Sequence, residues 1–307
     1  MKKQIIIGTR GSKLALLQAE SVSDRLVSLY PGYQFEIATV STTGDRNTDV
    51  SLEQLGGQGV FVKELEEALL HGDIDIAVHS LKDMLTIIPE ALCLAAVPER
   101  VDPRDAIISP FGGLRDVPYG ARVGTGSPRR GIQIRAMRPD IEISELRGNI
   151  DTRIKKAFLG ELDGIVIAAA ALIRLGLEEK ITEYLPEDAM VPAVGQGALG
   201  IETRSSDEDL VALVSKVNHE PTWRAVSAER AFLREMGGGC RAPIAALGSI
   251  DGRTLRLRGI ASSPDGSEML REEIKGSAER AEEVGKEMAR IMLKAGAASF
   301  VERGPGR

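Results

Sequence analysis

The first 80 residues alternate short apolar segments with amphipathic ones, and this alternation limits the fold more than any other feature. Segments 4–8, 35–41 and 74–80 have the composition of buried strands, whereas 61–73 has the pattern of a helix. Apolar residues also recur every three or four positions from Ala15 to Leu29. Because strands alternating with helices form mainly parallel sheets, we expect an α/β domain with helices on both faces.

Two further units are predicted downstream. A proline- and charge-rich stretch at 98–105 introduces a second strand–helix pattern, and segment 198–204 has the pattern of a strand that could pair back into the first unit. From about residue 218 an amphipathic helix, a hairpin around a PDG turn and a last helix indicate an α+β unit. The predicted domains are 1–100 with 197–217, then 101–196, then 218–307.

Composition and charge exclude several classes of protein. The 307-residue chain has a formal net charge of −6, which disfavours binding to nucleic acid or to an anionic membrane. No apolar run approaches the length of a membrane span, and the start lacks the apolar core of a signal peptide. The three histidines have no second ligand at metal-binding spacing, so no metal site is expected. We therefore expect a cytoplasmic enzyme without a metal.

The two cysteines lie in contrasting contexts. Cys93 stands in the apolar run ALCLAAV, which is typical of a core residue, whereas Cys240 follows three glycines in GGGCRAP. Glycines remove side chains from the approach to the sulfur and allow backbone angles closed to other residues. The adjacent Arg241 favours the thiolate form. Cys240 is therefore the candidate reactive thiol.

A carboxylate follows the strand at 74–80, in HSLKDM. Ligands bind at the carboxyl ends of parallel strands, which places Asp83 and Lys82 over a cleft. An ionised carboxylate accepts hydrogen bonds, so its partner would be a cation or N–H groups. The alternative is a helix cap, because Ser80 with Asp83 three positions later resembles a capping box.

The segment GTGSPRR at 124–130 indicates an anion site. Thr125 and Ser127 lie at a predicted strand end, and Pro128 suits the first position of a helix, where backbone N–H groups attract anions. Arg129 and Arg130 can each bind a carboxylate or phosphate in bidentate fashion. The spacing differs from that of a Walker loop, so carboxylates are at least as plausible as phosphates.

Together these motifs resemble the porphobilinogen deaminase (hydroxymethylbilane synthase) family. The resemblance runs from IGTRGSKLALLQA through HSLKDM, DPRDA, VGTGSPRR, LRGNIDTR, RLGL and VGQGALGIE to AERAFLREMGGGC. The order and spacing of these motifs over about 230 residues carry it, since each motif alone is weak.

The resemblance implies both a fold and a reaction. The fold is two α/β domains like those of periplasmic binding proteins plus a smaller α+β domain that presents the cysteine. The reaction is a transferase reaction that joins four porphobilinogen molecules, with loss of ammonia, into the linear tetrapyrrole hydroxymethylbilane on a covalent dipyrromethane primer. It implies a cytoplasmic monomer in tetrapyrrole biosynthesis whose product passes to uroporphyrinogen III synthase.

Residue roles are carried over by position. Asp83 would be the catalytic carboxylate and Cys240 the thioether anchor of the dipyrromethane. The cofactor site would also contain Asp83, Lys82, Ser127, Arg129 and Arg130. The substrate carboxylates and rings would be bound by Arg10, Ser12, Thr125, Arg147, Arg153 and Arg174.

The chain departs from the family pattern in three places. Leu85 stands where a proline usually follows the HS-x-KD-x core, Gly126 and Pro128 flank a single serine before the paired arginines, and Gln58 replaces a common lysine. We expect altered rates or loop mobility from these changes, with the reaction retained.

Two alternatives remain from the residues alone. A non-catalytic two-lobed protein that binds small carboxylate anions would explain the arginines, but it would not explain the third unit or GGGC. A cysteine-dependent acyl or redox enzyme would need a histidine or a second cysteine near Cys240, and the sequence indicates neither.

Overall fold

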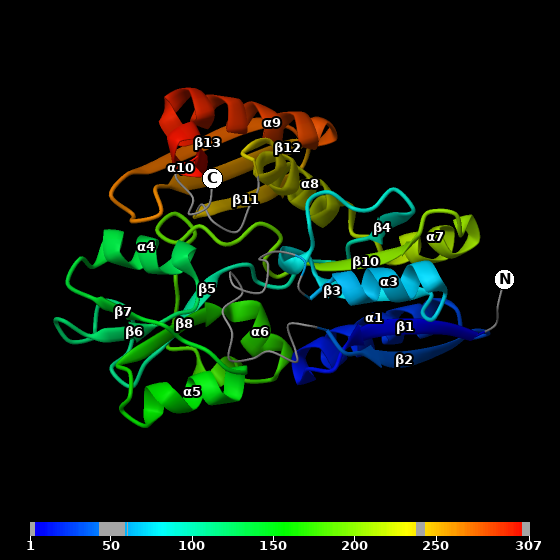
Figure 1. Ribbon diagram of the computed structural model, residues 1–307, viewed down its shortest axis with the longest axis horizontal. Coiled ribbons are helices and arrows are strands. Elements are labelled where there is room, and N and C mark those ends of the chain that lie inside the picture. Colours follow the sequence, from blue (N-terminus) through cyan, green and yellow to red (C-terminus); the bar gives the residue numbers. More distant parts are fainter. Residues whose placement is uncertain (1–3, 43–58, 60, 238–242, 303–307) are drawn as a thin grey trace.

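The computed structural model describes residues 4–42, 59, 61–237 and 243–302, and it contains three β-sheets (Figure 1). The first sheet has the strand order β2-β1-β3-β10-β4. Its strands are β1 (Gln4–Arg10), β2 (Gln34–Val40), β3 (Ile76–Ser80), β4 (Leu92–Ala96) and β10 (Leu199–Arg204). Strand β1 runs parallel to β2 and β3, whereas β10 is antiparallel to both β3 and β4. The return of β10 to the first sheet confirms the pairing expected for segment 198–204.

Helices cover both faces of this sheet. One face packs on α1 (Lys13–Leu29) and α7 (Glu208–Val214), and the other packs on α3 (Lys63–His71). The apolar spacing of α1 buries Ala15, Ala19, Val22 and Leu26. The expected α/β arrangement is therefore present, with the antiparallel β10 as a feature that the sequence pattern did not indicate.

The second sheet repeats the topology of the first, in the order β7-β6-β8-β5-β9. Its strands are β5 (Asp105–Ile108), β6 (Arg122–Gly124), β7 (Glu142–Ser144), β8 (Gly164–Ala168) and β9 (Glu183–Tyr184). Its helices are α4 (Pro128–Met137), α5 (Ile150–Phe158) and α6 (Ala169–Arg174), with a short 3₁₀ turn at Glu178–Lys180. In each sheet the antiparallel inner strand, β10 or β5, directly follows the segment that crosses from the other sheet.

The third unit packs helices on one face of a small antiparallel sheet. The strands are β11 (Ile244–Asp251), β12 (Thr254–Ser262) and β13 (Met269–Ser277), and β12 and β13 form the hairpin predicted around the PDG turn. The helices are α8 (Glu220–Glu235), α9 (Ala281–Met292) and α10 (Ala298–Glu302). The last helix, predicted over 278–296, corresponds to α9, and a break at Gly296, whose φ is 113°, separates it from α10, which the sequence pattern did not indicate.

The three units meet at the carboxylate of Glu229, which lies on α8 and is fully buried. Its two oxygens accept hydrogen bonds from Arg100 at 2.6 and 3.2 Å, where Arg100 lies on the crossing segment between β4 and β5. They also accept backbone N–H bonds from Gly195, on the returning segment, and from Gly248 in β11. One side chain of the third unit thus holds both connections between the first two sheets.

We predict that Arg100→Met lowers the free energy of unfolding by about 3–5 kcal/mol, because it leaves the buried Glu229 charge without its cation. Denaturant unfolding at pH 7 measures this change. The matched control is Arg253→Met, which breaks an exposed pair with Glu279 and should cost less than about 1 kcal/mol. Equal effects of the two substitutions would contradict the importance of the Glu229 junction.

Candidate functional site

Asp83 lies in a 3₁₀ turn, Leu81–Asp83, that follows directly from β3. Its side chain is partly exposed and makes no hydrogen bond or ion pair with any residue that the structure describes. Ser80 does not cap this turn: its hydroxyl exchanges hydrogen bonds with the buried Gln18 amide, at 2.9 and 3.2 Å. The capping alternative is therefore wrong, and the Asp83 carboxylate is available to a ligand.

The Lys82 side chain, which belongs to the first α/β unit, interacts electrostatically with charged residues of the second unit. Burial lowers the pKa of its ammonium group, and the nearby Arg130 and Arg129 guanidinium groups lower it further. The Asp83 and Asp105 carboxylates act in the opposite direction. Residues predicted separately from HSLKDM and GTGSPRR thus interact at one site.

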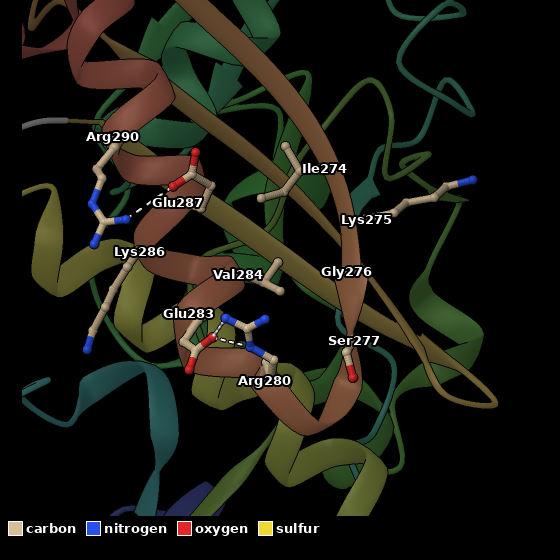
Figure 2. A pocket seen from close by; sticks show the side chains of 10 residues that line it. All are labelled: Ile274, Lys275, Gly276, Ser277, Arg280, Glu283, Val284, Lys286, Glu287 and Arg290. Carbon is tan, nitrogen blue, oxygen red and sulfur yellow. Dashed lines mark hydrogen bonds and ion pairs between the residues drawn. The ribbon is translucent and has the colours of Figure 1, made fainter.

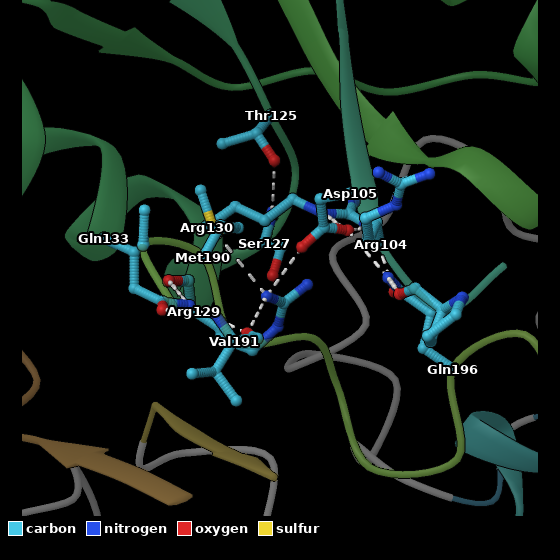
Figure 3. A network of polar contacts seen from close by, with 12 residues as sticks. Arg104, Asp105, Thr125, Ser127, Arg129, Arg130, Gln133, Met190, Val191 and Gln196 are labelled. Atoms are coloured by element: carbon cyan, nitrogen blue, oxygen red, sulfur yellow. Dashed lines mark hydrogen bonds and ion pairs between the residues drawn. The ribbon is translucent and has the colours of Figure 1, made fainter. Parts of the chain in front are cut away.

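A buried carboxylate, Asp105, organises the paired arginines (Figure 3). Arg129 Nη1 lies 2.8 Å from Asp105 Oδ2, and Arg130 Nη2 lies 2.8 Å from Oδ1. The Gln196 side-chain amide donates to the same Oδ1 at 2.8 Å. Burial by itself would raise the pKa of Asp105, but the two arginines outweigh it and hold the pKa well below its usual range. Asp105 is therefore ionised at neutral pH.

The two arginines that GTGSPRR predicts as anion-binding groups have little exposure to solvent. Both are buried, each with 7% of its surface exposed. Arg129 also donates to the Val191 carbonyl at 2.7 Å, and burial lowers its pKa. Lys82, Arg129 and Arg130 interact electrostatically with Asp105, Lys82 interacts also with Asp83, and Arg153 interacts with Arg130. The local charge is thus positive in a protein that is acidic overall.

The loop before α4 has the predicted form. Pro128 occupies the first turn of the helix and Ser127 its N-cap position. The buried Thr125 hydroxyl accepts the Ser127 backbone N–H at 3.3 Å. A Cβ on Gly126 would lie 2.7 Å from the Leu146 carbonyl oxygen, so the glycine that departs from the family pattern permits a close backbone approach.

The remaining predicted arginines hold different positions around this centre. Arg153 donates to the Gly148 carbonyl at 2.7 Å, and burial together with Arg130 lowers its pKa. Arg174 donates to the Gly197 carbonyl at 2.8 Å, and burial lowers its pKa to about 10. Arg147 forms a half-exposed pair with Glu145 at 2.6 Å. Arg174 therefore remains charged at neutral pH.

The first-sheet residues Arg10 and Ser12 lie at the start of α1. The Arg10 guanidinium carbon lies 3.8 Å from the centre of the Phe61 ring. Ser12 is the N-cap of α1 and accepts the Ala15 N–H. A hollow of about 420 Å³ beside Ser12 is lined also by Thr39, Val40 and Ser41. Among the described residues, no hydrogen bond or ion pair joins Ser12 to the charged cluster around Asp105.

Cys240, Arg241 and Gln58 lie outside the described residues. The helix α8 ends at Glu235, and Gly237 follows with a φ of 80°, so the chain turns sharply just before the cysteine. Cys93, in contrast, is placed: its sulfur lies 3.5 Å from the Thr203 hydroxyl, within the first sheet.

A second hollow, of about 490 Å³, lies in the third unit between β13 and α9 (Figure 2). Its walls include the ion pairs Arg280–Glu283 and Arg290–Glu287 and the apolar side chains Ile274 and Val284. None of the predicted site residues lines it. Among the described residues there is also no cluster of three or more metal-ligating side chains, and no helix long and apolar enough to cross a bilayer.

Sequence reasoning missed three polar residues of this site. Gln18 fixes Ser80, Asp105 pairs with both arginines, and Gln196 is bonded to Asp105 and to the Pro103 carbonyl. Asp105 is the second aspartate of DPRDA, but its partners Arg129 and Arg130 lie 24 and 25 positions further along the chain. No local spacing rule connects them.

The geometry is consistent with a dipyrromethane carrying carboxylates, because the donor set is rich in buried cations and retains one carboxylate for the pyrrole N–H groups. Family models match most of the chain. Residues 5–212 match the dipyrromethane cofactor-binding domain of porphobilinogen deaminase, and 223–294 match its C-terminal domain.

Individual relatives agree along nearly their whole length. The porphobilinogen deaminase of Syntrophus aciditrophicus is 50% identical over 96% of this chain and 97% of its own length. That of Pelobacter propionicus is 48% identical over 98% and 97%. Among solved structures, YhfZ from Shigella flexneri aligns with 75% of this chain and 89% of its own, at 17% identity and a TM-score of 0.39. The chain belongs to the porphobilinogen deaminase family, transferases of tetrapyrrole biosynthesis that use a dipyrromethane cofactor.

Proposed function

We propose that Asp83 is the catalytic carboxylate of this family's reaction in the present chain, and that Cys240 anchors the dipyrromethane. The observation that supports Asp83 most directly is its position: a carboxylate at the end of β3, unpaired within the described structure and next to Lys82, which interacts electrostatically with the buried Arg129 and Arg130. The Asp83 carboxylate is thereby placed beside a cation and is available to accept hydrogen bonds from N–H groups.

Asp83 acts on the substrate as charge develops. The bond between the aminomethyl carbon of porphobilinogen and its nitrogen breaks, ammonia leaves, and the ring system becomes cationic. The carboxylate accepts the pyrrole N–H and stabilises that positive charge. The dipyrromethane supplies the free α-carbon to which the first substrate is joined. When the new carbon–carbon bond forms, that α-carbon loses a proton, and Asp83 Oδ accepts it. Asp83 then returns this proton to the aminomethyl nitrogen of the next porphobilinogen, which leaves as ammonia, so that the proton is conserved over the cycle.

In this proposal the lysine and arginine side chains of the site bind the carboxylate groups of the cofactor and of the substrate. Each pyrrole has one acetate and one propionate group, so negative charge accumulates as the chain grows. Lys82, Ser127, Arg129 and Arg130 hold the cofactor, and the substrate rings are bound by Arg10, Ser12, Thr125, Arg147, Arg153 and Arg174. Planar guanidinium groups suit this task because each can bind a carboxylate through two N–H donors.

Asp105 orients the paired arginines before any ligand binds. Its two oxygens contact both guanidinium groups, and Gln196 fixes one oxygen. A single buried carboxylate offsets only part of the positive charge of Lys82, Arg129 and Arg130. The remaining charge is available for the carboxylates of the cofactor.

The wider setting is part of the same proposal. We divide the chain into domains 1–100 with 197–217, 101–196 and 218–307, and infer a cytoplasmic monomer whose product passes to uroporphyrinogen III synthase. A two-lobed protein that only binds small carboxylates is the alternative. That alternative does not explain why the Asp83 carboxylate has no partner among the described residues, nor why the third unit carries a cysteine.

We predict that Asp83→Asn lowers kcat by about 10²–10⁴-fold, because the amide has neither the charge nor the basicity of the carboxylate. Steady-state formation of hydroxymethylbilane from porphobilinogen measures this. The control is Asp24→Asn, an exposed position on α1, which should leave kcat unchanged. A kcat for Asp83→Asn within threefold of the parent protein would rule out the assigned role.

We also predict that Asp105→Asn lowers the free energy of unfolding at pH 7 by about 3–5 kcal/mol, since Arg129 and Arg130 stay buried without their counter-ion. The folded-state pKa of Asp105 is depressed, so its contribution is complete above about pH 4 and is lost as the pH falls further. The difference from the parent protein should therefore shrink below pH 4. Denaturant unfolding from pH 7 to pH 3 measures it, and a constant difference would contradict the account.

A further inference from the structure

Helix α8 supports the Asp83 turn from two sides. Arg230 Nη2 donates to the Leu85 carbonyl at 2.6 Å, two residues after Asp83. On the other side, Glu229 accepts the Gly195 N–H at 2.7 Å. A Cβ added to Gly195 would lie 3.2 Å from the backbone nitrogen of Lys82. The returning segment at Gly195 is thus pressed against the residue that precedes Asp83. Two adjacent residues of one helix bracket the aspartate.

Packing strengthens this contact. Val226, one turn earlier on α8, lies in one buried cluster with Leu81 and Met84. Met84 is extended, with φ −76° and ψ 143°, and its N–H is bonded to the Leu81 carbonyl. Leu81 and Met84, before and after Asp83 in the chain, are therefore held by apolar contacts. The Leu85 carbonyl is held by its hydrogen bond from Arg230.

Arg230 is suited to hold a backbone carbonyl. Only 8% of its surface is exposed, and burial lowers its pKa to about 10, with Arg234 acting in the same direction and Glu202 in the opposite one. It remains protonated at neutral pH, so the bond to Leu85 is charge-assisted. Helix α8 also ends five residues before Cys240, so the same rigid element leads to both the aspartate turn and the cysteine loop.

We propose that Arg230 is a positioning residue for Asp83: through the Leu85 carbonyl it sets where the carboxylate lies relative to the chain attached at Cys240. This inference rests on the proposed catalytic role of Asp83. Leu85, where the resemblance leads one to expect proline, makes the contact more important, because leucine leaves the backbone freer than a proline ring would.

The test compares Arg230→Met with the parent protein in porphobilinogen turnover. Methionine has similar length and no N–H donor. We expect kcat to fall by about 10–100-fold with KM within about threefold, because small displacements of a reacting group cost rate rather than binding. The control is Arg234→Met, one turn further on, whose partner Glu282 lies within the third unit and which should keep the parental kcat.

A double-mutant cycle separates positioning from general support of the fold. Leu85→Pro keeps the carbonyl, and proline suits this place because Met84 already has the extended backbone that precedes proline. It restricts the loop independently of Arg230. We therefore expect Leu85→Pro to raise kcat by a larger factor in Arg230→Met than in the parent protein. The same factor in both backgrounds would overturn the proposal, as would a kcat for Arg230→Met within twofold of the parent.

Should Arg230→Met fail to fold, Arg230→Lys replaces it. Lysine keeps the charge but has a shorter, non-planar donor group, so we expect a three- to tenfold lower kcat, and a parental kcat overturns the proposal. Intact mass of each variant shows whether the primer is attached. Two results test the proposed function by itself: attachment of the primer in the parent protein, and loss of turnover in Asp83→Asn. If both hold and the Arg230 variants behave as the parent does, only the inference about Arg230 fails.

Discussion

The buried carboxylate of Asp105 is the interaction on which the rest of the site depends. Arginine side chains are rarely buried without a counter-ion, because removing a charge from water is costly. Asp105 permits two of them, Arg129 and Arg130, to lie only 7% exposed while they interact electrostatically with Lys82. Asp105 does not neutralise all of these cations, and the remaining positive charge favours anionic ligands.

The third unit contacts several parts of the other two units through a single helix. Its helix α8 binds both crossing segments through Glu229, contacts the Asp83 turn through Val226 and Arg230, and ends just before the cysteine loop. In the proposed mechanism, a growing chain of pyrroles attached at Cys240 has to meet the Asp83 carboxylate at each addition. Helix α8 contacts the Asp83 turn and ends five residues before Cys240, so in that mechanism it helps to define the starting geometry.

Much of the fold could be predicted from the sequence because it follows from local patterns. The strand–helix alternation, Pro128 at the first turn of α4, the hairpin after Ser262 and the end of α8 at the glycines all reflect periodicity or backbone preference. The position of Asp83 at the end of β3 followed from the rule for parallel sheets. The resemblance to a family then supplied roles that no spacing rule could assign.

The contacts that could not be predicted join residues far apart in the chain. The Arg100–Glu229 pair spans 129 positions and the Arg230–Leu85 contact spans 145. Ser80 offered a plausible local cap for its own turn, yet tertiary structure gave its hydroxyl to Gln18, 62 positions away. A polar side chain takes the partner that the assembled fold places nearest, and that partner is fixed only when the three units are packed.

The central claim is that the cation-rich site holds a pyrrole chain covalently attached at Cys240 and extends it in place. Intact mass spectrometry of the purified protein, before and after porphobilinogen is added, tests this most directly. The account predicts a dipyrromethane-sized adduct on the parent protein, its absence from Cys240→Ser, and further increments of one pyrrole each after substrate is added. A parent protein with no adduct even after incubation would contradict it and would favour a protein that only binds small carboxylates.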